Sequence, residues 1–255
     1  PIDLWQLSTK YIPPQRSDSF SFGIFKNSTD NLWEYSIDGF YRASQNQVEY
    51  RDFADIFLNP HLETELVLGE GKAYGVEFMV KKNLGIVTGW LAYTYSRSLF
   101  RSLSLFEQEQ INGNEWFPSN FDKPHEINFI LSRKIYPRGL FNLSANYSTG
   151  RPVSAVNASY ILNGGLIVPD YSARNQYRIP DYFRVDASFT VEKVFSKKGD
   201  SLNFSIYNLF GRKNAYSVFW QRDGDSQQLR PYRLAILGSI FPSITYSIQW
   251  GGAND

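Results

Sequence analysis

Residues 182–192 read YFRVDASFTVE, and this stretch decides the fold class of the chain. Apolar side chains occupy every second position, at Phe183, Val185, Ala187, Phe189 and Val191. Charged or hydroxyl side chains fill the positions between them. A side-chain period of two predicts a β-strand with one apolar face and one polar face.

The same alternation recurs about nine times along the chain. We predict strands at residues 17–26, 32–42, 74–80, 87–95, 127–135, 141–147, 182–192, 202–206 and 234–250. Four short turns, NSTDN at 27–31, NLG at 83–85, YPRG at 136–139 and KKGD at 197–200, separate them in alternation with long connections. Short turns alternating with long loops are the layout of a transmembrane β-barrel. The alternation weakens after Asn208, and Pro242 lies within the last segment, so we expect a bulge or bend there.

The composition supports this fold class. The chain has 255 residues and a net charge of +1, so neither a basic nucleic-acid footprint nor an acidic tail is present, and we expect no nucleic-acid partner. Aromatic residues make up 17% of the chain, which suits the aromatic girdles of a barrel. No run of 18 apolar residues occurs and the mean hydropathy is −0.36. Barrel strands need an apolar residue only at alternate positions, so low hydropathy does not exclude them.

The odd number of strands has a structural consequence. Bacterial single-chain barrels have an even number of strands, and an open nine-stranded sheet would leave two unpaired edges in lipid. We therefore expect residues 1–255 to be the carboxyl-terminal portion of a larger barrel, closed by another segment.

Several strings give a more specific indication of the family. They are GEGKAYGVEFMVKK at 69–82, GWLAYTYSRS at 89–98, FDKPHEINF at 121–129, YSTGRPV at 147–153, YRIPDYFRVDASF at 177–189, NLFGRKNAYSVF at 208–219 and PSITYSIQW at 242–250. In this order they resemble TonB-dependent receptors of the Bacteroidetes type. The resemblance implies an all-β fold, a transmembrane antiparallel β-barrel of 22 strands in the Gram-negative outer membrane, of which this chain supplies about the last nine. It also implies an amino-terminal plug domain and a TonB box that contacts the inner-membrane TonB complex, both outside this chain.

Charged side chains in the polar parity of the strands are candidates for contact with such a plug. The main ones are Glu34, Asp38, Glu77, Arg184, Asp186 and Glu192, with Arg42 and Lys81 beside them. The alternative is that they only solvate a polar lumen wall. Arg133 and Lys193 fall in the apolar parity close to short turns, where a long side chain can reach the membrane interface.

Ligand capture is expected on the long loops, because binding residues commonly lie on loops that a rigid scaffold carries. The candidates are Trp116, Phe117, Tyr160, Tyr171, Arg174, Tyr177, Trp220 and Arg222. Aromatic rings together with arginine suit sugars, aromatic siderophores or corrinoids. The alternative for each is packing between loops or a place in the outer girdle.

Catalysis and metal binding have little support in the sequence. His61 and His125 are the two histidines, and the chain has no cysteine, so we predict no enzyme activity, no cofactor and no metal site. His125 lies near Asp122 at the start of a predicted strand, and we expect it to cap that strand.

The predicted function is therefore that of a receptor that binds a scarce nutrient, such as a siderophore, corrinoid, glycan or peptide, and imports it to the periplasm. Its expected partners are outer-membrane lipid, its own plug and remaining strands, and the TonB complex. Three alternatives stay open: a barrel subunit of an envelope complex with a surface lipoprotein, a small outer-membrane barrel enzyme, and a soluble β-sandwich.

Overall fold

The structure, a computed structural model, describes residues 7–162, 167–171, 173–195, 199–222 and 229–248. Within these ranges the chain is almost entirely β-structure. The only helices described are three 3₁₀ turns, η1 (Leu62–Glu65), η2 (Glu107–Glu109) and η3 (Asn112–Asn114). None of the described helices has the length and apolar character needed to cross a membrane.

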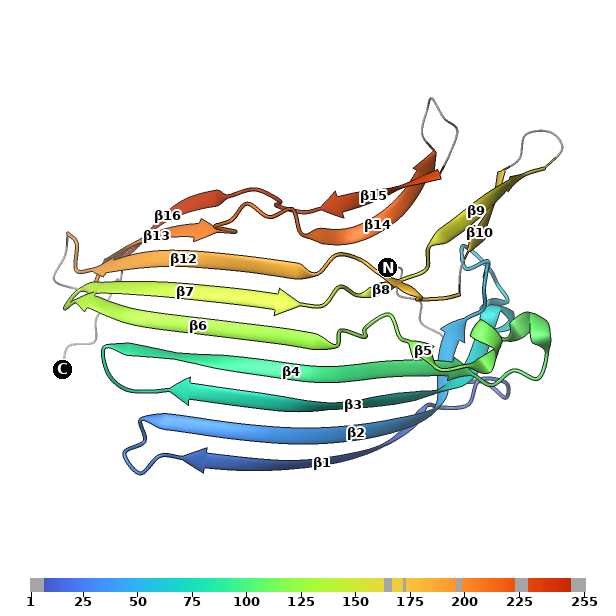
Figure 1. Ribbon diagram of the computed structural model, residues 1–255, viewed down its shortest axis with the longest axis horizontal. Coiled ribbons are helices and arrows are strands. Elements are labelled where there is room, and N and C mark those ends of the chain that lie inside the picture. Colours follow the sequence, from blue (N-terminus) through green and yellow to red (C-terminus); the bar gives the residue numbers. More distant parts are fainter. Residues whose placement is uncertain (1–6, 163–166, 172, 196–198, 223–228, 249–255) are drawn as a thin grey trace.

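Nine long strands lie side by side in one antiparallel sheet (Figure 1). In order across the sheet they are β1 (Arg16–Asn27), β2 (Trp33–Tyr50), β3 (Leu66–Lys82), β4 (Val87–Ser102), β6 (His125–Tyr136), β7 (Gly139–Ser148), β12 (Tyr182–Glu192), β13 (Ser201–Tyr207) and β16 (Phe241–Ser247). Each strand pairs with the next main strand along the chain, so the sheet is a simple meander. The predicted number of strands and their order are confirmed.

The long connections at one end of the sheet carry shorter strands of their own (Figure 1). They are β5 (Phe117–Pro118), β8 (Pro152–Val153), β9 (Val156–Ile161), β10 (Ile167–Tyr171), β11 (Tyr177–Arg178), β14 (Ala215–Arg222) and β15 (Leu229–Ala235). Strand β5 adds to β4, while β9 with β10, β8 with β11 and β14 with β15 form separate pairs. The short turns lie at the opposite end.

The register places apolar side chains on one face across the whole sheet. Ile37 of β2 lies opposite Ile24 of β1 and Phe78 of β3, and the same parity continues to Ile244 of β16. On this outer face Phe20 is 71% exposed and Ile244 is 69% exposed. So large an apolar surface requires an apolar neighbour, and the polar inner face requires none.

Polar and aromatic residues bound the apolar band of the outer face at both ends. Tyr74 and Lys82 are eight positions apart on β3, and His125 and Arg133 are eight positions apart on β6. Eight strand residues span about 26 Å along the strand. With strands tilted by about 35–45°, this corresponds to a height of about 19–22 Å, close to the apolar band of about 25 Å that a transmembrane barrel presents to lipid.

The last predicted strand needs a correction. We expected one strand over residues 234–250, but Leu234 belongs to β15, which pairs with β14, and β16 begins only at Phe241. Residues 236–240 leave the sheet because β14 and β15 form a hairpin of their own. Pro242 lies in β16, which pairs only with β13 among the described strands, and a proline is tolerated at such an edge. Trp250 and part of the turn at 197–200 lie outside the described residues.

The structure also changes two expectations about the loops. Strand β2 continues to Tyr50 and β3 begins at Leu66, so the connection between the strands predicted at 32–42 and 74–80 is much shorter than expected. After Asn208, where a bulge was expected, the chain turns out of the sheet: Asn208 and Gly211 both have positive φ, at 55° and 58°.

Gly89 offers a test of the register. Its φ is 153°, and a Cβ there would lie 2.1 Å from the carbonyl oxygen of Ile130 on the neighbouring strand. At Gly39, also on the outer face, a Cβ would meet nothing closer than 3.9 Å. We expect Gly89→Ala to lower the free energy of unfolding by about 1–3 kcal/mol, and Gly39→Ala to leave it nearly unchanged. Denaturant unfolding of the intact protein measures both. Equal effects would contradict the close approach of β4 and β6.

Candidate functional site

A buried carboxylate ties strand β4 to two of the long connections. Asp122, whose side chain is fully buried, accepts hydrogen bonds at Oδ1 from Arg97 Nε (3.1 Å) and from the backbone N–H of Ser98 (2.7 Å). Its Oδ2 forms an ion pair with Arg178. Arg178 also donates to the backbone oxygens of Asp122 (2.7 Å) and Gly150 (2.9 Å). Strand β4 and the segments before β6 and β12 are thus held by one carboxylate.

Arg174 forms a second clamp between loops. Its Nη1 donates to the backbone oxygen of Tyr50 (2.6 Å), and its Nε and Nη2 donate to Asp52 (3.1 and 2.5 Å). Its backbone N–H donates to Asn112 Oδ1 (2.7 Å). The side chain is 16% exposed, so most of its hydrogen-bonding capacity is used within the protein.

Asn175 extends this clamp to the β4–β6 connection. Its backbone has positive φ (58°), and its side-chain amide donates to the oxygens of Pro118 (2.8 Å) and Asn120 (3.0 Å). The residue is 6% exposed. Sequence reasoning did not select Asp122, Asn175 or Arg178 as binding or loop-fixing residues. Asp122 and Arg178 lie within the strings FDKPHEINF and YRIPDYFRVDASF, which was the available signal.

A pocket of about 610 Å³ lies at the loop end of the inner face. Its lining includes the inner-face side chains Asn128, Asn146, Tyr182 and Tyr207, with Tyr216 of β14 beside them. The volume falls within the range of small-molecule sites. Amide and phenol groups offer a ligand hydrogen-bond donors and acceptors without net charge.

Arg184 holds two tyrosines of the pocket lining, whereas Lys123, Glu126 and Arg151 are the charged residues of the lining itself. Arg184 donates to the hydroxyls of Tyr182 and Tyr207 (3.0 Å each) and to Asp186 Oδ2 (3.0 Å). Its guanidinium also lies 4.5 Å from the centre of the Tyr207 ring. The pair Arg184 and Asp186 therefore fixes the two tyrosines, and the positive charge of Arg184 is itself paired.

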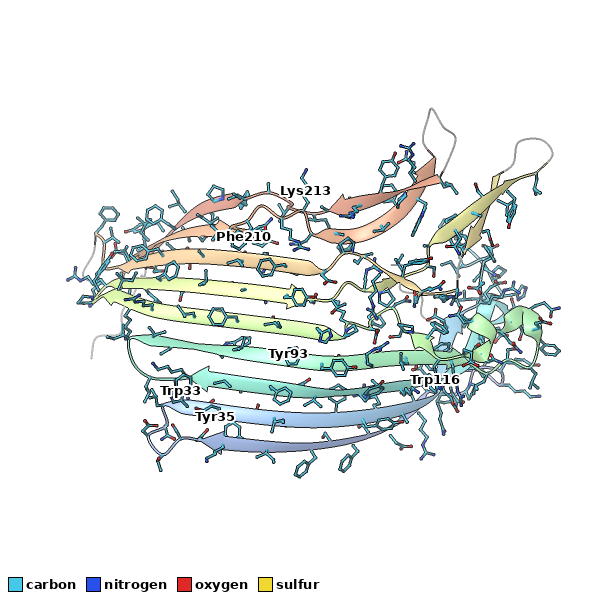
Figure 2. All side chains as sticks on the ribbon, in the orientation of Figure 1. Trp33, Tyr35, Tyr93, Trp116, Phe210 and Lys213 are labelled. Atoms are coloured by element: carbon cyan, nitrogen blue, oxygen red, sulfur yellow. The ribbon has the colours of Figure 1, made fainter. Side chains whose placement is uncertain are left out.

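The neighbouring candidates Trp116 and Phe117 lie on opposite faces of the sheet. Phe117 is buried against Phe100 and Ile111, with the two phenyl ring centres 5.6 Å apart. Trp116 is at the loop end of the sheet (Figure 2), where Lys72 Nζ lies 4.0 Å and the Arg101 guanidinium 4.9 Å from its ring centre. Lys72 and Arg101 share the outer-face parity, so the indole belongs to the outside of the sheet.

The remaining loop candidates do not form one cluster. Tyr160 lies on β9 and is 59% exposed, Tyr171 on β10 is 45% exposed and packs edge-on against Phe53, and Tyr177 on β11 is 47% exposed. Trp220 and Arg222 lie on β14, in a different hairpin. The side chain of Arg222 falls outside the described residues.

The candidate plug-facing residues all have inner-face parity. Glu34 pairs with Lys81 (3.3 Å) and accepts from Asn83 (2.7 Å). Asp38 and Glu77 lie directly opposite one another, and neither has a cationic partner among the residues that the structure covers. Contact of these side chains, or of Arg184, Asp186 and Glu192, with a plug stays a prediction.

The imidazole ring of His125 packs against aromatic side chains of the neighbouring strand. Its Nδ1 lies 2.9 Å from the Tyr93 hydroxyl, and its ring packs against Tyr93 and Tyr95 on the outer face. Asp122 is engaged by two arginines, so the two side chains form no acid–base pair. His61 precedes η1, and its backbone N–H donates to Asn59 Oδ1 (2.8 Å). Among the described residues, no group of three or more His, Cys, Asp or Glu is arranged to hold a metal.

Asp122→Asn tests the buried clamp. The change leaves Arg97 and Arg178 without their anionic partner in a buried site, which costs about 3–5 kcal/mol. Asp18→Asn is the matched control, because Asp18 pairs with Arg16 at 3.6 Å where both side chains are at least 72% exposed. We expect that control to cost under about 1 kcal/mol. The midpoint of denaturant unfolding measures both, and a loss at position 122 no greater than at position 18 would contradict the clamp.

The loop before β3 is expected to respond to acid. Hydrogen bonds from Arg51 (2.7 and 2.6 Å) and from the backbone N–H of Asp55 (3.1 Å) hold the pKa of Glu65 below its ordinary value, with the Arg51 bonds as the main cause. A lowered folded-state pKa means that Glu65 stabilises the loop at neutral pH and down through the ordinary value of 4.5, and loses this effect at still lower pH.

Hydrogen exchange at the Asp55 amide measures this response. We expect protection at neutral pH and its loss in acid below the ordinary glutamate range. Glu65→Gln should show weak protection at both values. Equal protection of the wild type and the variant at neutral pH would contradict the role of the carboxylate.

Comparisons with known proteins agree with this architecture. The sheet superposes on the ferripyoverdine receptor of the outer membrane of Pseudomonas aeruginosa with a TM-score of 0.54 and 15% identity, covering 91% of this chain and 28% of that one. The ferric-catecholate import receptor Fiu from E. coli K12 superposes with a TM-score of 0.57 and 13% identity, covering 96% of this chain and 30% of that one. The FrpB iron transporter from Neisseria meningitidis superposes with a TM-score of 0.53 and 13% identity, covering 80% of this chain and 28% of that one. The chain thus spans less than a third of the length of these proteins, and the likeness shows a shared fold.

Among curated proteins, no sequence matches the chain. A family model described as "TonB dependent receptor-like, beta-barrel" matches residues 4–209, which is most of the chain. The family description is that of a receptor barrel, which agrees with the prediction that the chain is not an enzyme. With its meander of nine two-faced strands, the chain belongs to the TonB-dependent receptor-like β-barrel family.

Proposed function

We propose that residues 1–255 form the carboxyl-terminal part of the barrel domain of a TonB-dependent outer-membrane receptor, the last nine strands of a barrel of about 22. The observation that carries this proposal is the sheet itself, because its outer face is apolar over nine strands and its inner face is polar. Strands β1 and β16 each pair on one side only among the described strands. In lipid, further strands must pair with both edges.

The receptor would take up a scarce nutrient through its loops. The three structural neighbours are named as receptors or transporters of iron or iron chelates, so we propose a ferric siderophore first, with a corrinoid, glycan or peptide as alternatives. The inner pocket and the exposed rings of Tyr160, Tyr171 and Tyr177 support a ligand with aromatic or hydroxyl groups. Arg174, Asn175 and Asp122 would hold the loops in a fixed arrangement around that ligand.

Transport requires parts beyond these residues. We propose an amino-terminal plug that packs against the inner face near Asp38 and Glu77, and a TonB box that engages the inner-membrane complex. The likeness of seven sequence strings supports a Bacteroidetes-type receptor. A surface lipoprotein over the loops is the second candidate role, favoured by the two hairpins β9–β10 and β14–β15 at the loop end.

Uptake of ⁵⁵Fe as a ferric catecholate tests the function. Cells that lack the receptor are complemented with the wild type, with Tyr177→Ala and Tyr216→Ala together, or with Tyr136→Ala in a short turn as the control. We expect energy-dependent uptake by the wild type and the control, and a half-saturation concentration about fivefold to a hundredfold higher for the double variant, since each ring contact contributes about 0.5–1.5 kcal/mol.

The outcomes separate the candidate roles. Wild-type uptake of a corrinoid, glycan or peptide in place of iron would change the ligand and keep the receptor. Absence of energy-dependent uptake of all four classes, together with a lipoprotein that co-purifies in stable amounts, would overturn transport and favour the complex subunit.

A further inference from the structure

Three cationic side chains stand on the outer face at the short-turn ends of the strands. They are Lys26 on β1, Lys82 on β3 and Arg133 on β6. Lys26 and Arg133 are exposed, and none of the three has an acidic partner among the residues that the structure describes. Lys82 Nζ lies 5.6 Å from the ring centre of Trp33, which in turn stacks on Tyr35 (Figure 2).

The two ends of the outer face differ in charge. On strands β1 to β6 the described outer-face acids are Asp18 and Glu70, and both lie toward the loop end. There Asp18 pairs with Arg16 (3.6 Å) and Glu70 with Arg101 (2.7 Å). At the short-turn end the outer face of these strands carries cations alone. Arg16, Lys72, Arg97 and Arg101 also lie on the outer face toward the loops, so that end carries both signs of charge, whereas the turn end carries positive charge alone.

The three cations follow the tilt of the strands. Through the strand pairing Lys26 is in register with Val80 of β3, and Lys82 lies two residues closer to the short turns than Val80. Lys82 is in register with Leu131 of β6, and Arg133 lies two residues closer to the short turns than Leu131. A shift of two residues over two strands corresponds to a tilt of about 35°, within the range of membrane barrels. The cations thus lie in a line at a single depth.

The aromatic residues at the other boundary of the apolar band show the same shift. From Tyr74 on β3 to His125 on β6 the level moves by two residues over two strands. The line of cations is therefore parallel to the aromatic line, with the apolar band between them. Neighbouring cations are two strands apart and shifted by two residues, so they lie about 12 Å from one another along this line.

We propose that Lys26, Lys82 and Arg133, with Trp33 at the same interface, form a binding line for the phosphate groups of anionic phospholipids in the leaflet on the short-turn side. Each ammonium or guanidinium meets a phosphate at the edge of the apolar band, while the acyl chains cover Phe78, Val80 and their neighbours. The indole of Trp33 suits the same depth, because one end of it is apolar and the other is a hydrogen-bond donor. The inference rests on the proposed function only in requiring that the sheet spans a membrane.

Binding of phosphatidylglycerol to the intact protein, purified from its membrane in detergent, tests the proposal. The variant carries Lys26→Gln, Lys82→Gln and Arg133→Gln, and the control carries Lys10→Gln, Lys72→Gln and Lys213→Gln toward the loop end. A cation near an anionic lipid surface contributes about fivefold to affinity, so we expect roughly a hundredfold weaker binding for the variant and little change for the control. The variant's loss should shrink in high salt.

Several results would overturn the proposal. They are unchanged binding by the variant, an equal loss in the control, equal wild-type affinity for phosphatidylcholine, and competition by soluble glycerol phosphate at the concentration at which the lipid binds. If the triple variant does not fold, Lys26→Gln alone, on the exposed strand β1, should still show the fivefold loss. Lipid binding is measured without a transported ligand, so failure of the uptake experiment and failure of this one are distinguishable.

Discussion

Backbone pairing in an apolar surrounding is the constraint on which the rest of this structure depends. In hydrocarbon no water is present to satisfy a peptide N–H or C=O, so each strand must find its partners in neighbouring strands. The meander from β1 to β16 satisfies this for eight consecutive interfaces. Because the ladder also fixes the register, it commits every side chain to the lipid side or to the lumen side, and a slip of one residue would reverse both faces.

The distribution of charge follows from that commitment. Several charged groups of the inner face and the loops are paired: Asp122 with two arginines, Arg184 with Asp186, Arg174 with Asp52. These pairs lie where burial makes an unpaired charge costly, and they hold long loops in place above the inner pocket. On the outer face of strands β1 to β6, the short-turn boundary of the apolar band carries cations and no acid among the described residues.

The candidate site was harder to predict than the fold. Arg174 was predicted to bind a ligand because arginine is common in such sites. Its guanidinium instead donates hydrogen bonds to Asp52 and to the backbone oxygen of Tyr50, because three loops far apart in sequence meet at this residue. The role of Asp122 could not be predicted beyond its place in the string FDKPHEINF, because a sequence does not show which side chains are buried. Trp116 and Phe117 are adjacent in the chain, but β5 adds to β4 and places them on opposite faces.

The sequence by itself determined the strands, their number and their two faces, because a period of two is a local property of the backbone and is strong enough to read without tertiary contacts. It also determined the positions of the short turns at 27–31, 83–85 and 136–139. Only the tertiary structure decided the end of the last strand, the hairpins within the loops and the partners of the buried charges. Those features depend on pairings between distant segments, such as β14 with β15 or Asp122 with Arg178, and alternation along one strand carries no information about them.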